Sequence, residues 1–158
     1  MLKYIGCAVT VASAAIWGFE KSSSLKKSVL LTEALRDLVK RTGDDIDMLC
    51  RPLGEIFSSY SDSLLSQTGF MEELNENGFQ KALMSVQHML PGEAMEILLP
   101  FAKRLGGGDR EAETALCLRT AALLSELCEK LREKLPEKTK MYRALPLLCA
   151  LSAVILII

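Results

Sequence analysis

The sequence has few of the side chains from which catalytic and metal sites are built. Histidine occurs once, as His88, and one histidine with no partner residue indicates neither a general base nor a metal ligand. The cysteines form no C-x-x-C pair and match no zinc-ligand spacing; they are Cys7, Cys50, Cys117, Cys128 and Cys149. The run Gly106-Gly107-Gly108 lacks the Gly-Lys-Ser/Thr of a phosphate-binding loop. We therefore expect no enzyme, no cofactor, no metal and no small-molecule substrate.

An excess of charge of one sign is also missing. The net charge is −1, so no overall field would draw the chain to nucleic acid, and we expect no nucleic-acid partner. An odd number of scattered cysteines argues against a disulfide framework and is typical of a reducing compartment.

Sustained strand alternation is absent, whereas apolar residues recur at spacings of three and four. This periodicity predicts six helices joined by short loops: 25–41, 52 to a break at 66–69, 70–76, 79–90, 91–105 and 109–135. The fold class expected is therefore all-α, with a six-helix antiparallel bundle over residues 21–137. The last helix should bury a leucine stripe made of Leu116, Leu123, Leu127, Leu131 and Leu135.

The helix boundaries follow from capping and breaking residues. Ser22-Ser23-Ser24 would cap the first helix of the bundle, and Thr42-Gly43 would end it. Asp109 would cap the last helix. Pro136 either separates that helix from the segment that follows it or bends the two together.

Two apolar runs flank the bundle, Tyr4 to Phe19 and Ala144 to Ile158, each about 15 residues long. A membrane-spanning helix needs about 20 residues, so both are short, but together they predict transmembrane helices at 1–20 and 138–158. The lysines and Arg143 that adjoin the runs lie on the side of the bundle, which predicts a cytoplasmic middle domain. The lipid bilayer is thus an expected partner.

The N-terminal run also permits a different interpretation. Ala12-Ser13-Ala14 after a short apolar stretch resembles the cleavage site of a signal peptide. In that case the protein would be a secreted or surface-bound helical interaction module whose C-terminal tail is its anchor.

Acidic residues are concentrated between positions 44 and 76, where Arg51 is the one base. They are Asp44, Asp45, Asp47, Glu55, Asp62, Glu72, Glu73 and Glu76. This concentration is either a solvated face or a docking surface for a basic partner, because complementary potentials select partners and speed association. We treat Asp44, Asp45, Asp47, Glu72, Glu73 and Glu76 as candidate partner-binding residues.

Two motifs in the C-terminal half carry a resemblance. Leu105-Gly106-Gly107-Gly108-Asp109-Arg110-Glu111 opens the last long helix, and Lys140-Met141-Tyr142-Arg143 leads into the apolar run. With the layout of anchor, helical domain and tail, these motifs resemble the stage III sporulation protein AB family.

The resemblance implies a function and a location. It implies a non-enzymatic platform in the mother-cell membrane around the forespore, within a channel-like complex, with a domain similar to the cytoplasmic F domains of type II secretion platforms. The implied partners are a secretion-type sporulation ATPase and other stage III sporulation membrane proteins. Asp109, Arg110 and Glu111 would orient the last helix and present a contact surface.

Overall fold

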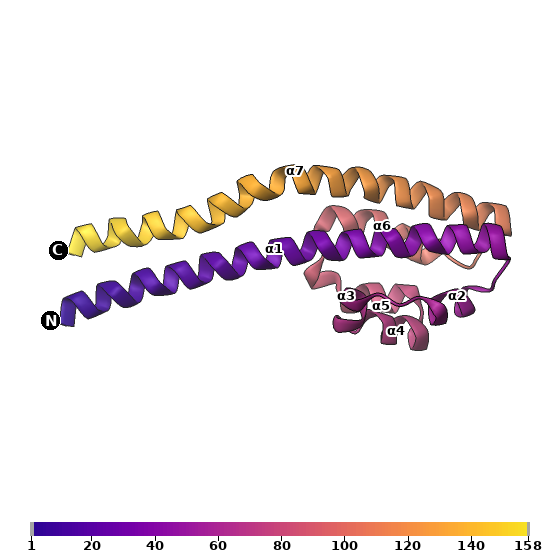
Figure 1. The fold of residues 1–158 in the computed structure, drawn as a ribbon, viewed down its shortest axis with the longest axis horizontal. Helices are drawn as coiled ribbons and strands as arrows, with labels where there is room; N and C mark the ends of the chain where they lie inside the picture. Colours follow the sequence, from indigo (N-terminus) through magenta and orange to yellow (C-terminus); the bar gives the residue numbers. More distant parts are fainter. Residues whose placement is uncertain (1, 158) are drawn as a thin grey trace. The chain divides into compact units, whose positions relative to one another are not determined.

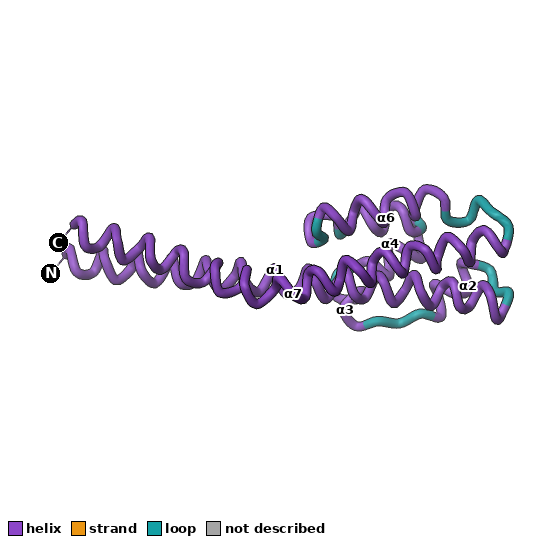
Figure 2. The backbone as a smooth tube through the Cα atoms, turned by 90° about the horizontal axis from the view of Figure 1, so that it is seen from above, coloured by secondary structure: helices purple, strands orange, loops and turns teal. Residues whose placement is uncertain are grey.

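The computed structural model describes the backbone of residues 2–157 and the side chains of residues 12–146, 148–150 and 152. Every element in this part of the chain is helical (Figure 2), which confirms the all-α class. The chain divides into two compact units, one of residues 28–130 and one that combines 1–27 with 131–158. The side chains of most of the two apolar runs, Cys7 included, lie outside the described residues.

The first helix, α1 (Leu2–Leu49), continues through both boundaries that the sequence predicts for it. The predicted cap at Ser22 is wrong because this serine is fully buried inside the helix. The predicted stop at Thr42-Gly43 is also wrong. The Thr42 hydroxyl donates to the Leu38 carbonyl at 2.8 Å, as hydroxyls within helices do, and the chain turns only at Cys50, where φ is +53°.

The last helix, α7 (Arg110–Ile157), also runs through a predicted boundary. Pro136 and Pro146 both lie inside it, so separation of the helix at Pro136 is wrong. A proline removes its own N–H from the hydrogen-bond ladder, but the residues on either side still form theirs. The lost bond is therefore local and does not end a helix of 48 residues.

Five short α-helices and a 3₁₀ turn connect the two long ones. They are α2 (Leu53–Ser59), α3 (Ser63–Gln67), α4 (Phe70–Asn77), α5 (Phe79–Ser85), η1 (Gln87–Met89) and α6 (Gly92–Arg104). The helix predicted after Pro52 is split in two, because the Asp62 carboxylate accepts from the N–H groups of Leu64 and Leu65 and starts a new helix. The helix predicted over 79–90 likewise ends at Ser85, whereas the helices predicted at 70–76 and 91–105 are confirmed.

The core of residues 28–130 is organised around Phe79. Its ring meets Phe70 and Phe101 edge to face, with centroids 5.7 and 5.2 Å apart, and it lies 6.3 Å from Phe57. One ring therefore joins α2, α4, α5 and α6. Within this unit, α1 lies between α7 and the group formed by α2 to α5 (Figure 1). Leu31, Leu35 and Leu38 of α1 are buried in this core.

In the same unit, α7 presents small residues and leucines to the core. Cys117, Ala121, Leu124 and Leu127 are buried, and Leu116 is partly buried against the core. The predicted leucine stripe is therefore confirmed at Leu127 and wrong at Leu123, which is 43% exposed. A Cβ added to Gly43 of α1 would lie 2.8 Å from the Cβ of Cys117, so the two helices approach too closely at this point for a larger side chain between them.

The terminal parts of α1 and α7 form the other unit, in which they lie side by side (Figure 1). They approach closely at Gly18, where an added Cβ would lie 2.7 Å from the Tyr142 carbonyl oxygen. The Arg143 guanidinium lies 5.2 Å from the centre of the Phe19 ring.

In this helix pair several small residues are buried while the largest apolar side chains are exposed. Gly18, Ser22 and Ala150 are buried, whereas large apolar side chains are about half exposed or more: Ile16, Trp17, Phe19, Met141, Leu145 and Leu148. Among the residues that the structure describes, no helix combines the length and the apolar character that crossing a membrane requires.

Candidate partner-binding site

The turn from α6 to α7 holds the motif that resembles the sporulation family. Gly106 has a φ of +84°, a conformation that glycine adopts without strain. Asp109 caps α7 as predicted, since its carboxylate accepts from the N–H of Ala112 at 2.9 Å. The glycines end one helix and the aspartate begins the next, so the motif builds a tight and defined corner.

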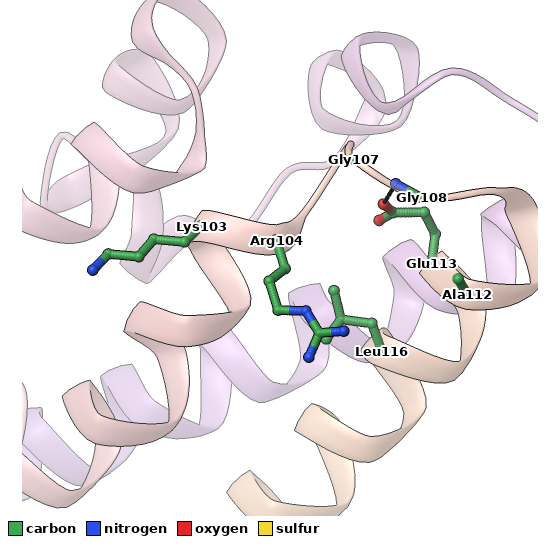
Figure 3. Close-up of a pocket in the computed structure, with 7 residues that line it drawn as sticks. All are labelled: Lys103, Arg104, Gly107, Gly108, Ala112, Glu113 and Leu116. Carbon is green, nitrogen blue, oxygen red and sulfur yellow. Dashed lines mark hydrogen bonds between the residues drawn. The ribbon is translucent and has the colours of Figure 1, made fainter.

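Glu113 ties this corner together, and no pattern in the sequence indicated its role. Its Oε1 atom accepts from the N–H group of Gly106 at 3.0 Å and from that of Gly108 at 2.9 Å. Figure 3 shows the bond to Gly108. The side chain is only 7% exposed. A capping box places the acidic residue three positions after the cap, where this chain has Ala112. Glu113 is one residue further on and reaches back to the glycine loop instead, so the known pattern does not identify it.

Arg110 connects the corner to the end of α1. Its guanidinium donates to the carbonyl oxygen of Asp47 and lies 3.6 Å from the Asp47 carboxylate. Asp47 lies in the last turn of α1, where carbonyl groups lack helical partners and attract cations. The structure thus brings together two predicted site residues, Asp47 and Arg110, whose contact links α1 to α7. Glu111 beside them is exposed.

The predicted acidic surface is partly neutralised. Asp45 lies 4.0 Å from Arg41, and Glu55 lies 3.8 Å from Arg51. Asp62 is a helix cap. The candidate acidic residues without an ion pair in the described chain are therefore Asp44 on α1 and Glu72, Glu73 and Glu76 on α4.

Two separate acidic groups result from this arrangement. No hydrogen bond or ion pair among the described residues joins the α1 group to the α4 group. The α4 group begins in the first turn of its helix, where the macrodipole stabilises carboxylates. It holds three of the four candidate carboxylates that have no ion pair in the described chain.

The remaining reactive groups are structural or isolated. Cys117 is fully buried, and burial together with the charge of nearby Glu113 raises its pKa to about 12. Its thiol is therefore unreactive at neutral pH. His88 is exposed on η1. In the described residues no cluster of histidine, cysteine and carboxylate side chains could hold a metal ion.

The model of a family described as stage III sporulation protein AB matches residues 3–158. No curated protein and no solved structure matches the chain.

Proposed function

Because the chain belongs to the stage III sporulation protein AB family, we propose that it is a non-enzymatic membrane platform of a sporulation-specific, secretion-like channel complex. In this proposal residues 28–130 form a cytoplasmic domain that docks a secretion-type sporulation ATPase at the mother-cell membrane. Other stage III sporulation membrane proteins would be its further partners. Its domain would then correspond in role to the F domain of type II secretion platforms.

The observation that carries the membrane part is the burial pattern of the terminal helix pair. Large apolar side chains, among them Ile16, Trp17 and Leu148, are exposed, while Gly18 and Ser22 are buried between the helices. In a protein surrounded by water, most large apolar side chains would be buried in the interior. In lipid, helices associate through small residues and turn large apolar ones outward. The pattern therefore supports α1 and α7 as a paired anchor in the bilayer.

The ATPase-docking part rests on α4. Glu72 and Glu76 are exposed and Glu73 is partly exposed, and no basic side chain in the described residues pairs with them. Unpaired charges at a rim favour partners of opposite charge and raise the association rate. We therefore assign these three carboxylates as the docking face for basic residues of the ATPase.

Charge reversal tests this docking face. Glu72→Lys with Glu73→Lys should replace two attractions by repulsions. Each of the two substitutions should cost about 0.5–1 kcal/mol of binding free energy at an exposed site. Binding of the full-length protein in nanodiscs to the ATPase encoded with it should weaken about five- to thirtyfold at physiological salt. Glu93→Lys with Glu129→Lys changes the net charge equally at other exposed positions and should leave affinity unchanged. Equal affinity for both double variants would refute the α4 face.

Topology can be tested through Cys50, which is exposed at the end of α1. A membrane-impermeant maleimide should label Cys50 only after the cells are opened. Labelling in intact cells, or a mature chain that begins at residue 15, would favour the secreted module with a cleaved signal peptide. The backbone of α1 is helical through Ala12-Ser13-Ala14, and Ala14 is partly buried, which supports an uncleaved helix.

A further inference from the structure

A cavity of about 280 Å³ that is partly open to solvent lies at the corner between α6 and α7, apart from the docking face on α4. Its walls include Gly107, Gly108 and the side chains of Arg104, Glu113 and Leu116 (Figure 3). Small-molecule sites usually enclose about 300–1,000 Å³. This cavity is below that range and has the size to receive a single long side chain.

Glu113 defines what the cavity can bind. Its Oε1 atom already accepts two backbone N–H groups, but its Oε2 atom is buried and has no hydrogen-bond partner in the described chain. A buried carboxylate oxygen without a donor is unfavourable. An ionised carboxylate only accepts hydrogen bonds, so the missing group must be a donor, and a cation satisfies it best.

The cations of the chain itself do not fill this position. Figure 3 shows the Lys103 ammonium directed away from the Glu113 carboxylate, and the Arg104 guanidinium beside Leu116. Among the described residues, no ion pair joins Arg104 to Glu113. The donor for the Oε2 atom of Glu113 must therefore come from outside this part of the chain.

A second cavity continues the surface along the same two helices. It measures about 260 Å³ and shares Arg104 and Leu116 with the first. Ile97, Phe101 and Leu123 form its apolar part, and Glu96 and Arg119 also line it. An apolar surface beside a carboxylate fits a protein segment better than a free cation, because a segment can place an apolar side chain next to a charged one.

We propose that the Glu113 cavity binds an arginine side chain of a partner protein, with an apolar neighbour of that arginine in the second cavity. Arginine fits better than lysine because its planar guanidinium presents several N–H donors in a fixed arrangement that matches a carboxylate. This contact is independent of the α4 docking face and of the identity of the partner.

The glycines provide a direct test. The chain contains ten glycines, so ¹⁵N-glycine labelling of the full-length protein in micelles gives a sparse spectrum. The probes are N-acetyl-arginine amide and its neutral analogue N-acetyl-citrulline amide. The arginine probe should shift the amides of Gly106 and Gly108, which donate to Glu113, and should leave Gly54 and Gly69 in place. Citrulline should bind at least tenfold more weakly, and equal shifts with both probes would overturn the proposal.

Matched variants separate the cavity from general charge effects. Glu113→Gln keeps an oxygen for the two glycine N–H groups but turns the free acceptor into a donor, so arginine binding should fall at least tenfold. Unchanged Gly106 and Gly108 resonances in the free variant would show that the loop is intact. Glu129→Gln removes the same charge from an exposed position farther along α7 and should bind like the wild type. Equal losses in both variants would overturn the proposal.

Two further outcomes are decisive. N-acetyl-leucyl-arginine amide should bind more tightly than the arginine probe, because its leucine can contact the second cavity; equal binding would indicate a simple cation site and contradict a protein partner. Binding that is absent from the wild type and appears in Arg104→Ala would show that the chain's own arginine occupies the cavity, which would also overturn the proposal.

Discussion

The contact between Gly43 and Cys117 permits a quantitative test of how α1 packs on α7. An alanine at position 43 would place its Cβ 2.8 Å from the Cβ of Cys117, well inside ordinary contact distance. Overpacking of this kind costs about 1–3 kcal/mol. Alanine is also a better helix former than glycine by about 1 kcal/mol. Gly43→Ala should therefore reduce the free energy of unfolding by a net 0–2 kcal/mol, roughly.

A double-mutant cycle isolates the clash from these other effects. Cys117→Gly removes the atom that an alanine at position 43 would strike, although alone it destabilises by emptying a buried position. In the double variant the overpacking disappears, so its loss of stability should be smaller than the sum of the two single losses by about 1–3 kcal/mol. If Gly43 ended a helix, its replacement would strain the backbone independently of Cys117, and the two effects would add.

The assay uses Cys128, which is only 2% exposed in the same unit. Pulses of alkylation at increasing urea, read for Cys128 by mass spectrometry, report the unfolding of residues 28–130 in the full-length protein. Gly54→Ala is the matched control, because no atom lies within 4 Å of its added Cβ, and it should not destabilise. Additivity within about 0.5 kcal/mol in the Gly43–Cys117 cycle would refute the close packing.

Two other residues yield predictions that the same urea assay checks. Asp62→Ala leaves the first N–H groups of α3 without their cap and should cost about 1 kcal/mol, whereas Asp62→Asn keeps the acceptor and should be nearly neutral; equal losses would contradict the cap. The pKa of Cys117 is about 12 in the native state and about 9 when unfolded, so the native state keeps its proton while the unfolded chain loses it. Stability should therefore be unaffected below pH 9 and should fall as pH rises from 9 to 12; Cys117→Ala should reduce this slope, and an unchanged slope would rule out the assigned cause.

Local patterns predicted the helical class and several short elements but not the extent of the long helices. Gly69, Pro91 and the glycines at 106–108 mark element ends because the breaking residue and the turn coincide in the chain. Ser22, Gly43 and Pro136 carry the same local signals, yet all three lie inside helices. At Gly43 the decisive contact is with Cys117, a residue far away in the sequence, and no local pattern contains that information.

The candidate site was predicted in the same uneven way. The sequence identified Asp109 as a cap, because capping is a local interaction. The prediction from the acidic stretch treated Asp45 and Asp47 as unpaired carboxylates, because their partners Arg41 and Arg110 lie outside residues 44–76. Glu113 could not be assigned because its contacts are with a loop that precedes the helix, and its importance depends on a cavity that exists only after α6 and α7 have packed.

The link between Glu113 and the glycine loop bears on how this corner can vary among related chains. The Oε1 atom of Glu113 accepts hydrogen bonds from two backbone N–H groups, those of Gly106 and Gly108. The number of residues between Gly106 and Glu113 therefore determines whether both N–H groups can reach this atom. An inserted or deleted residue would break at least one of these bonds and shift the Asp109 cap relative to α7. Position 107 has more freedom in side chain, since an added Cβ there would meet its nearest atom, the Arg104 carbonyl oxygen, at 3.4 Å. Selection at this corner should therefore act more strongly on length than on the identity of the residue at 107.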